Sequence, residues 1–195
     1  MKKILLLSFL AFMGYLANAQ VQFGAKAGVN FSTLVGDDSE GAKTHTSFYG
    51  GAFARFSINE SIKFQPELVY SALGTKADDQ DVSGEFRFGY ITVPIMFQYH
   101  TPGGFFGETG PQLGFLVNSK VESEGTSVDF KDYTKSFDFN WAFGLGYQLK
   151  SGLGFNARYC LGLSKVIDGE ALIEQEVDTK NSVIQVGLFY VFKGK

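Results

Sequence analysis

Apolar and polar residues alternate with a period of two along most of the chain. Between positions 22 and 31, one face is apolar and the other is small or polar, with Phe23, Ala25, Ala27, Val29 and Phe31 against Gln22, Gly24, Lys26, Gly28 and Asn30. Such alternation is typical of a β-strand whose two faces have different surroundings. Eight segments show it, at about 22–31, 48–58, 62–72, 91–99, 105–117, 137–148, 155–163 and 184–192. The sequence therefore predicts an all-β protein of eight strands.

The connections between these segments alternate between long and short. The long ones lie at about 33–46, 75–85, 119–135 and 166–180, and the short ones at 59–60, 101–104 and 150–152. Bacterial outer membrane barrels have short periplasmic turns and longer external loops, and an even strand count leaves both ends of the chain in the periplasm. We therefore predict an eight-stranded antiparallel up-and-down transmembrane β-barrel in the outer membrane.

The two faces of the strands differ in size as well as polarity. One face is bulky and aromatic, most clearly at Phe137, Phe139, Trp141 and Phe143, and the other combines Gly with Gln, Asn and a few charges. Eight strands leave an interior only wide enough for side chains to fill, so the small polar face is expected inside and the aromatic face in lipid. A soluble periplasmic barrel that binds an apolar ligand would reverse the two faces, and it stays open as an alternative.

The first residues resemble an export signal. Lys2 and Lys3 precede an apolar run that ends at Leu16, and a small-x-small pattern follows at 17–19. We predict a signal peptide over 1–19, cleavage before Gln20, and a barrel domain over 20–195. No later segment contains the roughly 18 consecutive apolar residues that a membrane-spanning helix requires.

Composition agrees with a barrel of tightly packed strands. The chain has 24 Gly, 21 Phe and 9 Tyr, and only 19% of its residues are charged. Its mean hydropathy is only +0.01, because a barrel presents lipid with every second residue. A net charge of −3 argues against a nucleic-acid partner. The single Cys160 allows no internal disulfide, and its inward phase predicts a small core residue.

The inward phase gathers seven charged side chains. They are Lys26, Arg55, Lys63, Glu67, Glu108, Asp138 and Arg158. Because unpaired charges in a narrow lumen would be costly, we expect a structural network of ion pairs that fills the interior and blocks conduction. A conduit for small solutes is the alternative. The pairing depends on the stagger of the strands, so the sequence does not assign partners.

Catalytic and metal-binding motifs are weak. Only His45 and His100 could act as imidazole bases, and the predicted topology places them at opposite ends of the barrel. The acidic stretch 78–81 lacks the glycine and terminal glutamate of a calcium loop, so the acidic external loops are expected to be solvated. We predict a protein that is not an enzyme and has no cofactor or metal. A lipid-modifying enzyme and divalent-ion bridging to lipopolysaccharide remain alternatives.

Three prolines interrupt predicted strands. Pro66, Pro94 and Pro111 each remove a ladder donor, so we expect local bulges there, and a change of phase near Arg87 suggests a further bulge or a strand end above the bilayer.

The motifs around these prolines resemble a known family. The stretches 64–71 (FQPELVYS), 90–95 (YITVPI) and 108–111 (ETGP), with 144–147 (GLGY) and 185–188 (QVGL), are similar to the PorT-like outer membrane β-barrel family of Bacteroidota. This resemblance covers nearly all of the predicted mature chain and implies fold and location, but little biochemistry.

The leading functional hypothesis is a non-enzymatic outer membrane protein that anchors external loops. Its role would lie in envelope integrity, surface contact or support of secretion. The expected partners are outer membrane lipid, lipopolysaccharide and envelope or secretion proteins, and the barrel is expected to be a monomer.

Overall fold

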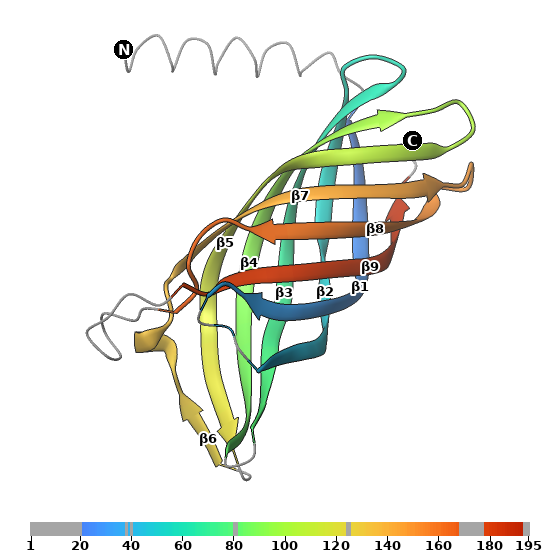
Figure 1. Cartoon of the computed structure of the whole chain (residues 1–195). Coiled ribbons are helices and arrows are strands. Elements are labelled where there is room, and N and C mark those ends of the chain that lie inside the picture. Colours follow the sequence, from blue (N-terminus) through green and yellow to red (C-terminus); the bar gives the residue numbers. More distant parts are fainter. Residues whose placement is uncertain are drawn as a thin grey trace, which may run out of the picture.

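The chain folds into a single closed sheet of long antiparallel strands in the computed structural model (Figure 1). The structure describes residues 21–37, 39, 41–79, 82–123, 126–167 and 178–192. The strands are β1 (Val21–Val35), β2 (Ala42–Ser57), β3 (Ile62–Asp79), β4 (Val82–His100), β5 (Phe105–Ser123), β6 (Thr126–Asp129), β7 (Phe137–Gln148), β8 (Leu153–Gly162) and β9 (Lys180–Val191). One 3-10 turn, η1 (Lys131–Tyr133), follows β6.

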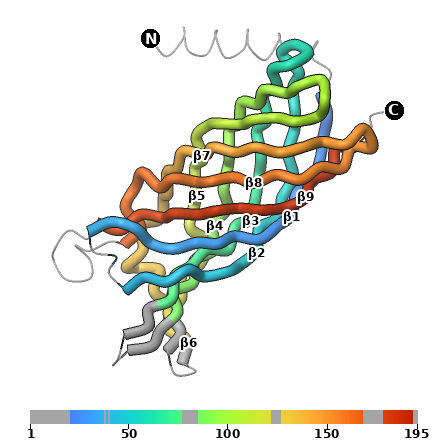
Figure 2. Tube along the Cα trace, turned by 45° about the vertical axis from the view of Figure 1, so that its right-hand side comes forward, coloured from blue at the N-terminus to red at the C-terminus, as the bar shows by residue number. Residues whose placement is uncertain are grey.

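Eight of the nine strands close the barrel. The order is β4-β3-β2-β1-β9-β8-β7-β5, and pairing of β4 with β5 completes the circle. β6 pairs only along the far end of β5, from Lys120↔Asp129 to Ser123↔Thr126, and therefore adds to the barrel rim without entering the circle. The prediction of a closed eight-stranded antiparallel barrel is confirmed, and Figure 2 shows the strands following one another around it.

The predicted signal peptide lies outside the described residues and stays a prediction. Within the residues that the structure does describe, no helix is both long and apolar enough to cross a membrane.

The connections differ at the two ends of the barrel. The turns after β2, β4 and β7 are short, as predicted, and in the first of them Asn59 Oδ1 accepts the backbone N–H of Ser61 and of Ile62 at 2.9 and 2.7 Å. The long loop predicted at 75–85 is wrong, since β3 and β4 continue as a paired hairpin to Asp79↔Val82. Part of the predicted 119–135 loop is likewise strand, as β5 runs to Ser123 and β6 folds back on it.

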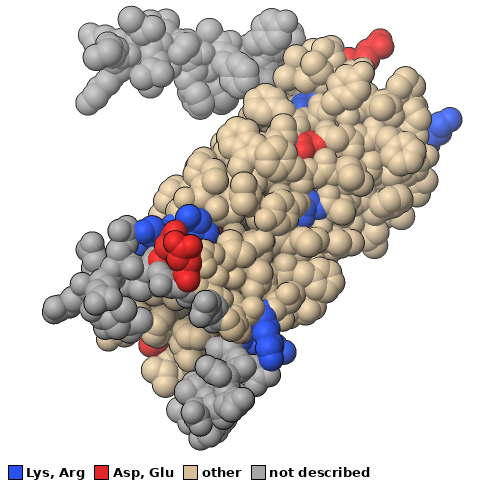
Figure 3. All heavy atoms as spheres, in the orientation of Figure 1, with Lys and Arg blue, Asp and Glu red and all other residues tan. Residues whose placement is uncertain are grey.

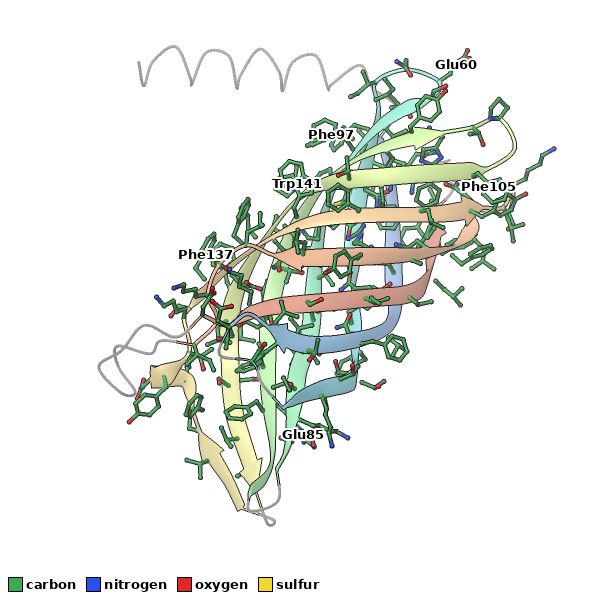
Figure 4. All side chains as sticks on the ribbon, in the orientation of Figure 1. Glu60, Glu85, Phe97, Phe105, Phe137 and Trp141 are labelled. Atoms are coloured by element: carbon green, nitrogen blue, oxygen red, sulfur yellow. The ribbon has the colours of Figure 1, made fainter. Side chains whose placement is uncertain are left out.

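The aromatic face points outward. Phe23 is 61% exposed, Phe143 52% and Trp141 37%, whereas Asn140 and Ala142, which alternate with them on β7, are buried. Figure 3 shows a side of the barrel that is largely uncharged, with Lys, Arg, Asp and Glu mostly towards its ends, and in Figure 4 Phe97, Trp141 and Phe137 project from the outer surface. The predicted sidedness is therefore confirmed, and the inside-out soluble alternative does not fit this arrangement.

The three prolines do not produce the predicted bulges. Register is unchanged across Pro66 between β3 and β4, across Pro94 between β4 and β5, and across Pro111 between β5 and β7. Register shifts occur instead between Thr44 and Tyr49 on β2 and between Gly89 and Tyr90 on β4. The second shift lies two residues from Arg87, where the sequence predicted one. Each proline instead coincides with a gap of two consecutive pairs in the ladder with one neighbouring strand, and the same register resumes beyond the gap.

Large inward side chains lie directly opposite glycines on the neighbouring strand. Cross-strand partners include Phe53↔Gly24, Phe106↔Gly146, Phe189↔Gly154 and Tyr49↔Gly28. A Cβ added at Gly24, Gly146 or Gly154 would overlap the ring opposite. Covering a strand glycine with an aromatic ring is a recognised way to fix register in sheets, and here it also fits bulky groups into a narrow lumen.

Candidate functional site

The seven charged residues assigned to the lumen from the sequence all lie on inward-facing positions. They come from β1 (Lys26), β2 (Arg55), β3 (Lys63 and Glu67), β5 (Glu108), β7 (Asp138) and β8 (Arg158). Six of the side chains are buried, and Lys63, near the end of the barrel with short turns, is half-buried. Their placement follows from strand alternation, which directs every second residue to the axis.

Arg158 forms the centre of this group. Its Nη1 and Nη2 donate to Glu67 Oε2 and Oε1 at 3.1 and 2.9 Å, and its Nε donates to Glu108 Oε1 at 2.9 Å. Lys26 Nζ donates to Glu67 Oε2 at 3.0 Å. Arginine suits this position because its planar fork can engage two carboxylates from one site. We call Lys26, Glu67, Glu108 and Arg158 the central ion cluster.

The central ion cluster is balanced and links opposite walls. Two cations meet two anions, and the side chains of all four are at most 3% exposed. β3, which carries Glu67, and β8, which carries Arg158, are four strands apart in either direction around the sheet. Amides complete the cluster, since Gln65 Nε2 donates to Glu67 at 2.8 Å and Gln98 Nε2 to Glu108 at 2.9 Å.

A glycine on β7 leaves room for Glu108 of β5 and Arg158 of β8 to form their ion pair. Gly144 on β7 is the cross-strand partner of both Glu108 and Arg158. A Cβ at this position would lie within 3 Å of the Glu108 side chain and of the Ala157 backbone. The small residue on the intervening strand therefore leaves space for the ion pair.

With the described residues of the lumen, the other three predicted residues form hydrogen bonds to neutral groups and no ion pair. Arg55 donates from Nε to Gln65 Oε1 at 2.7 Å and from Nη1 to Gln148 Oε1 at 2.6 Å. Lys63 Nζ donates to Ser57 Oγ at 3.3 Å. The Asp138 carboxylate accepts hydrogen bonds from neutral donors, each at 2.9 Å, which are Asn140 Nδ2, Asn181 Nδ2 and Ser164 Oγ. Four of the seven residues thus meet in ion pairs, and the other three contact neutral groups.

An aromatic layer closes the lumen on the side of the short turns. Phe53, Phe106 and Phe189 form a buried cluster, and the Arg55 guanidinium lies 5.3 and 5.6 Å from the ring centres of Phe53 and Phe189. His100 stacks on Phe106 with ring centres 4.9 Å apart. Sequence reasoning missed this layer, although Phe53 shares its phase with Arg55 and Phe106 with Glu108.

Little space remains between the aromatic layer and the central ion cluster. A void of about 10 Å³ lies between residues that include Arg55, Glu108, Phe106 and Phe189. That volume is at the lower limit for a single water molecule. The described part of the lumen is therefore packed with side chains at this level.

The two histidines lie at opposite ends, as the sequence indicated. His45 is at the end with long connections, where its Nδ1 lies 2.7 Å from Glu85 Oε1, and His100 is at the end with short turns. A hydrogen bond from Arg87 holds the pKa of Glu85 below its ordinary value. Cys160 is buried and within 3.8 Å of Gln112 Oε1, so it is a core residue, as predicted. Among the described residues, no three His, Cys, Asp or Glu side chains come together as a metal site.

Comparisons with known proteins agree with this architecture. A search of curated proteins found no match. Among solved structures, Neisserial surface protein A (NspA) aligns over 87% of this chain and 97% of its own with a TM-score of 0.53 and 12% identity. Ail, the attachment invasion locus protein of Yersinia pestis, in complex with the heparin analogue sucrose octasulfate, aligns over 88% and 99% with a TM-score of 0.52 and 16% identity. Residues 17–168 match the family model described as outer membrane protein beta-barrel domain, and the chain therefore belongs to this family of bacterial outer membrane barrels.

Proposed function

We propose that this protein is a non-enzymatic outer membrane anchor whose sealed barrel holds an external β-sheet for contacts at the cell surface. In this proposal, the barrel is exported with a cleaved signal peptide, and its role lies in surface contact, envelope integrity or support of secretion. The proline motifs at 64–71, 90–95 and 108–111 support a place in the PorT-like branch of Bacteroidota.

The observation that carries the proposal is the unequal length of the strands. β3, β4 and β5 have 18, 19 and 19 residues, whereas β7, β8 and β9 have 12, 10 and 12. About eleven residues of a tilted strand cross the apolar band. β3, β4 and β5 are therefore long enough to extend well beyond it. Figure 1 shows this extension, with β6 at its edge, at the end opposite the short turns. We call residues 75–79, 82–88, 119–123 and 126–133 the external extension.

Aromatic contacts stiffen the external extension. The rings of Phe86 and Phe130 are 5.6 Å apart, and those of Phe130 and Tyr133 are 5.2 Å apart. Val128 is 57% exposed beside them on β6. A rigid sheet that presents apolar groups to the exterior suits contact with another protein. The similarity in fold to Ail, the attachment invasion locus protein of Yersinia pestis, also supports a surface role.

Photocrosslinking in cells tests the surface role. A photoreactive amino acid at Val128 is expected to give adducts with other proteins, because that side chain is 57% exposed on the external extension. The matched control is the same amino acid at Leu145, which is 67% exposed on the apolar side of β7 and is expected to react with lipid only. Protein adducts at the periplasmic turn residue Ser151 but not at Val128 would contradict the proposal.

A pore is the second candidate, and the packed lumen argues against it. We expect the purified barrel to give no steady single-channel conductance in planar bilayers, because the central ion cluster and the aromatic layer occupy the cross-section. Bilayers that receive detergent without protein provide the baseline. Reproducible, long-lived openings of uniform size would instead favour a small-solute pore.

A further inference from the structure

A hollow lies at the end of the barrel with the short turns, outside the aromatic layer. Its volume is about 720 Å³, and its walls include the turns 101–104 and 149–151. Pockets of this size accommodate small organic molecules. In the orientation that outer membrane barrels adopt, this end faces the periplasm. We call this hollow the periplasmic vestibule.

The floor of the periplasmic vestibule contains a buried cation. Arg55 lines it and is only 1% exposed. The acceptors of its hydrogen bonds are the neutral amide oxygens of Gln65 and Gln148. Within the described lumen, the carboxylates of Glu67 and Glu108 are already matched by Lys26 and Arg158. The Arg55 charge is thus stabilised by amides and aromatic rings, without a carboxylate in contact.

A second cation lies on the adjacent wall. Lys63 is half-buried on β3 and also lines the periplasmic vestibule. Its Nζ donates a hydrogen bond to the hydroxyl of Ser57. Lys150 and Glu60 contribute one charge of each sign from the turns. Figure 4 shows Glu60 on the turn at the outer edge of the barrel. The ionised groups around the hollow therefore sum to a net positive charge.

Buried cations in proteins are normally paired, because desolvation without an opposite charge is costly. The Arg55 and Lys63 side chains converge on a hollow that is open to the periplasm and large enough for a ligand. We infer that the periplasmic vestibule binds a small organic anion, whose carboxylate or phosphate group is held by Arg55 and Lys63. The amide of Gln148 and the turn backbones around it supply further polar contacts for the rest of the ligand.

An NMR titration of the barrel in detergent micelles tests this inference. Sodium acetate and sodium phosphate serve as separate probes of the two anion chemistries, and sodium chloride at equal ionic strength is the reference. We expect saturable shifts at the Arg55 side chain and at the amides of 101–104 and 149–151 with at least one oxyanion. The stronger probe identifies carboxylate or phosphate as the preferred group. Shifts that are linear, or equal with chloride, would overturn the inference.

Two substitutions assign the binding to the proposed cation. Lys63→Gln is expected to weaken oxyanion binding about tenfold, which corresponds to the loss of one charge-assisted contact. This side chain is only half-buried, so the variant retains the fold, which altered migration of the unheated barrel on a denaturing gel would verify. The matched control, Lys120→Gln on the external extension, should leave the affinity unchanged. Equal affinity in wild type and Lys63→Gln would contradict a site at Lys63.

Discussion

Replacing Arg158 with methionine should destabilise the barrel by about 3–5 kcal/mol. The substitution leaves Glu67 and Glu108 buried together, with Lys26 as their remaining cation in the central ion cluster. Their oxygens would also lose the three hydrogen bonds that the guanidinium donates. The free energy of unfolding is measured by urea titration of the barrel in lipid vesicles, with fluorescence of Trp141, the one tryptophan of the sequence, as the signal.

Two further variants separate the loss of charge from the loss of shape. Arg158→Lys keeps the charge but lacks the planar fork, so we expect an intermediate loss of stability. Adding Glu67→Gln to Arg158→Met removes one of the uncompensated carboxylates and should recover part of the loss. Lys150→Met, on a short turn, is the surface control and should change stability by less than about 0.5 kcal/mol. Full stability of Arg158→Met would show that the ion pairs are not needed to hold the opposite walls together.

Replacing Phe143 with arginine should destabilise the inserted barrel by about 2–4 kcal/mol. Phe143 is 52% exposed and lies near the middle of β7, so its side chain faces the centre of the hydrocarbon layer. A charge at that depth must leave water with no partner in the lipid. The measurement is the same unfolding titration in vesicles, together with the fraction of protein that inserts.

Two matched variants serve as controls, one for the depth of the charge in the bilayer and one for the loss of the Phe143 ring. Leu149→Arg places the same charge at a short turn, where the cost should fall to about 0–1 kcal/mol. Phe143→Leu keeps an apolar group at the same site and should have a small effect. If Phe143→Arg were harmless in vesicles and the protein stayed dissolved without detergent, the outward aromatic face would not be in lipid.

Most of the barrel could be predicted because alternation is a local property of the chain. Each spanning strand has one face in lipid and one in the lumen, so apolar and small or polar residues alternate along it, as on β7 from Phe137 to Tyr147. The paired ends of β3 and β4, at 75–79 and 82–85, were missed for the same reason. Outside the hydrocarbon, an outward-facing residue meets water in place of lipid, so Lys76 and Glu85 are polar and the apolar alternation is lost, although these two residues pair across β3 and β4.

The inward aromatic layer was not predicted, because large aromatic residues were assigned to the outer face. Phe53, Phe106 and Phe189 have the inward phase, but bulky rings are expected outside a narrow barrel. The glycines opposite them make room, and this compensation is visible only when the register pairs Phe53 with Gly24, Phe106 with Gly146 and Phe189 with Gly154. For the three prolines, the sequence predicted bulges that the structure does not have. The register is the same on both sides of each proline.

The sequence by itself determined the eight strands of the barrel, the outward aromatic face, the seven inward charges and the separation of the two histidines, because each depends on the residue pattern along individual strands. Only the tertiary structure decided that Arg158 meets Glu67 and Glu108 while Arg55 and Asp138 bind neutral groups. These contacts join residues up to 93 positions apart in the chain. The stagger that brings them to the same height arises from closing the whole sheet, and no single segment encodes it.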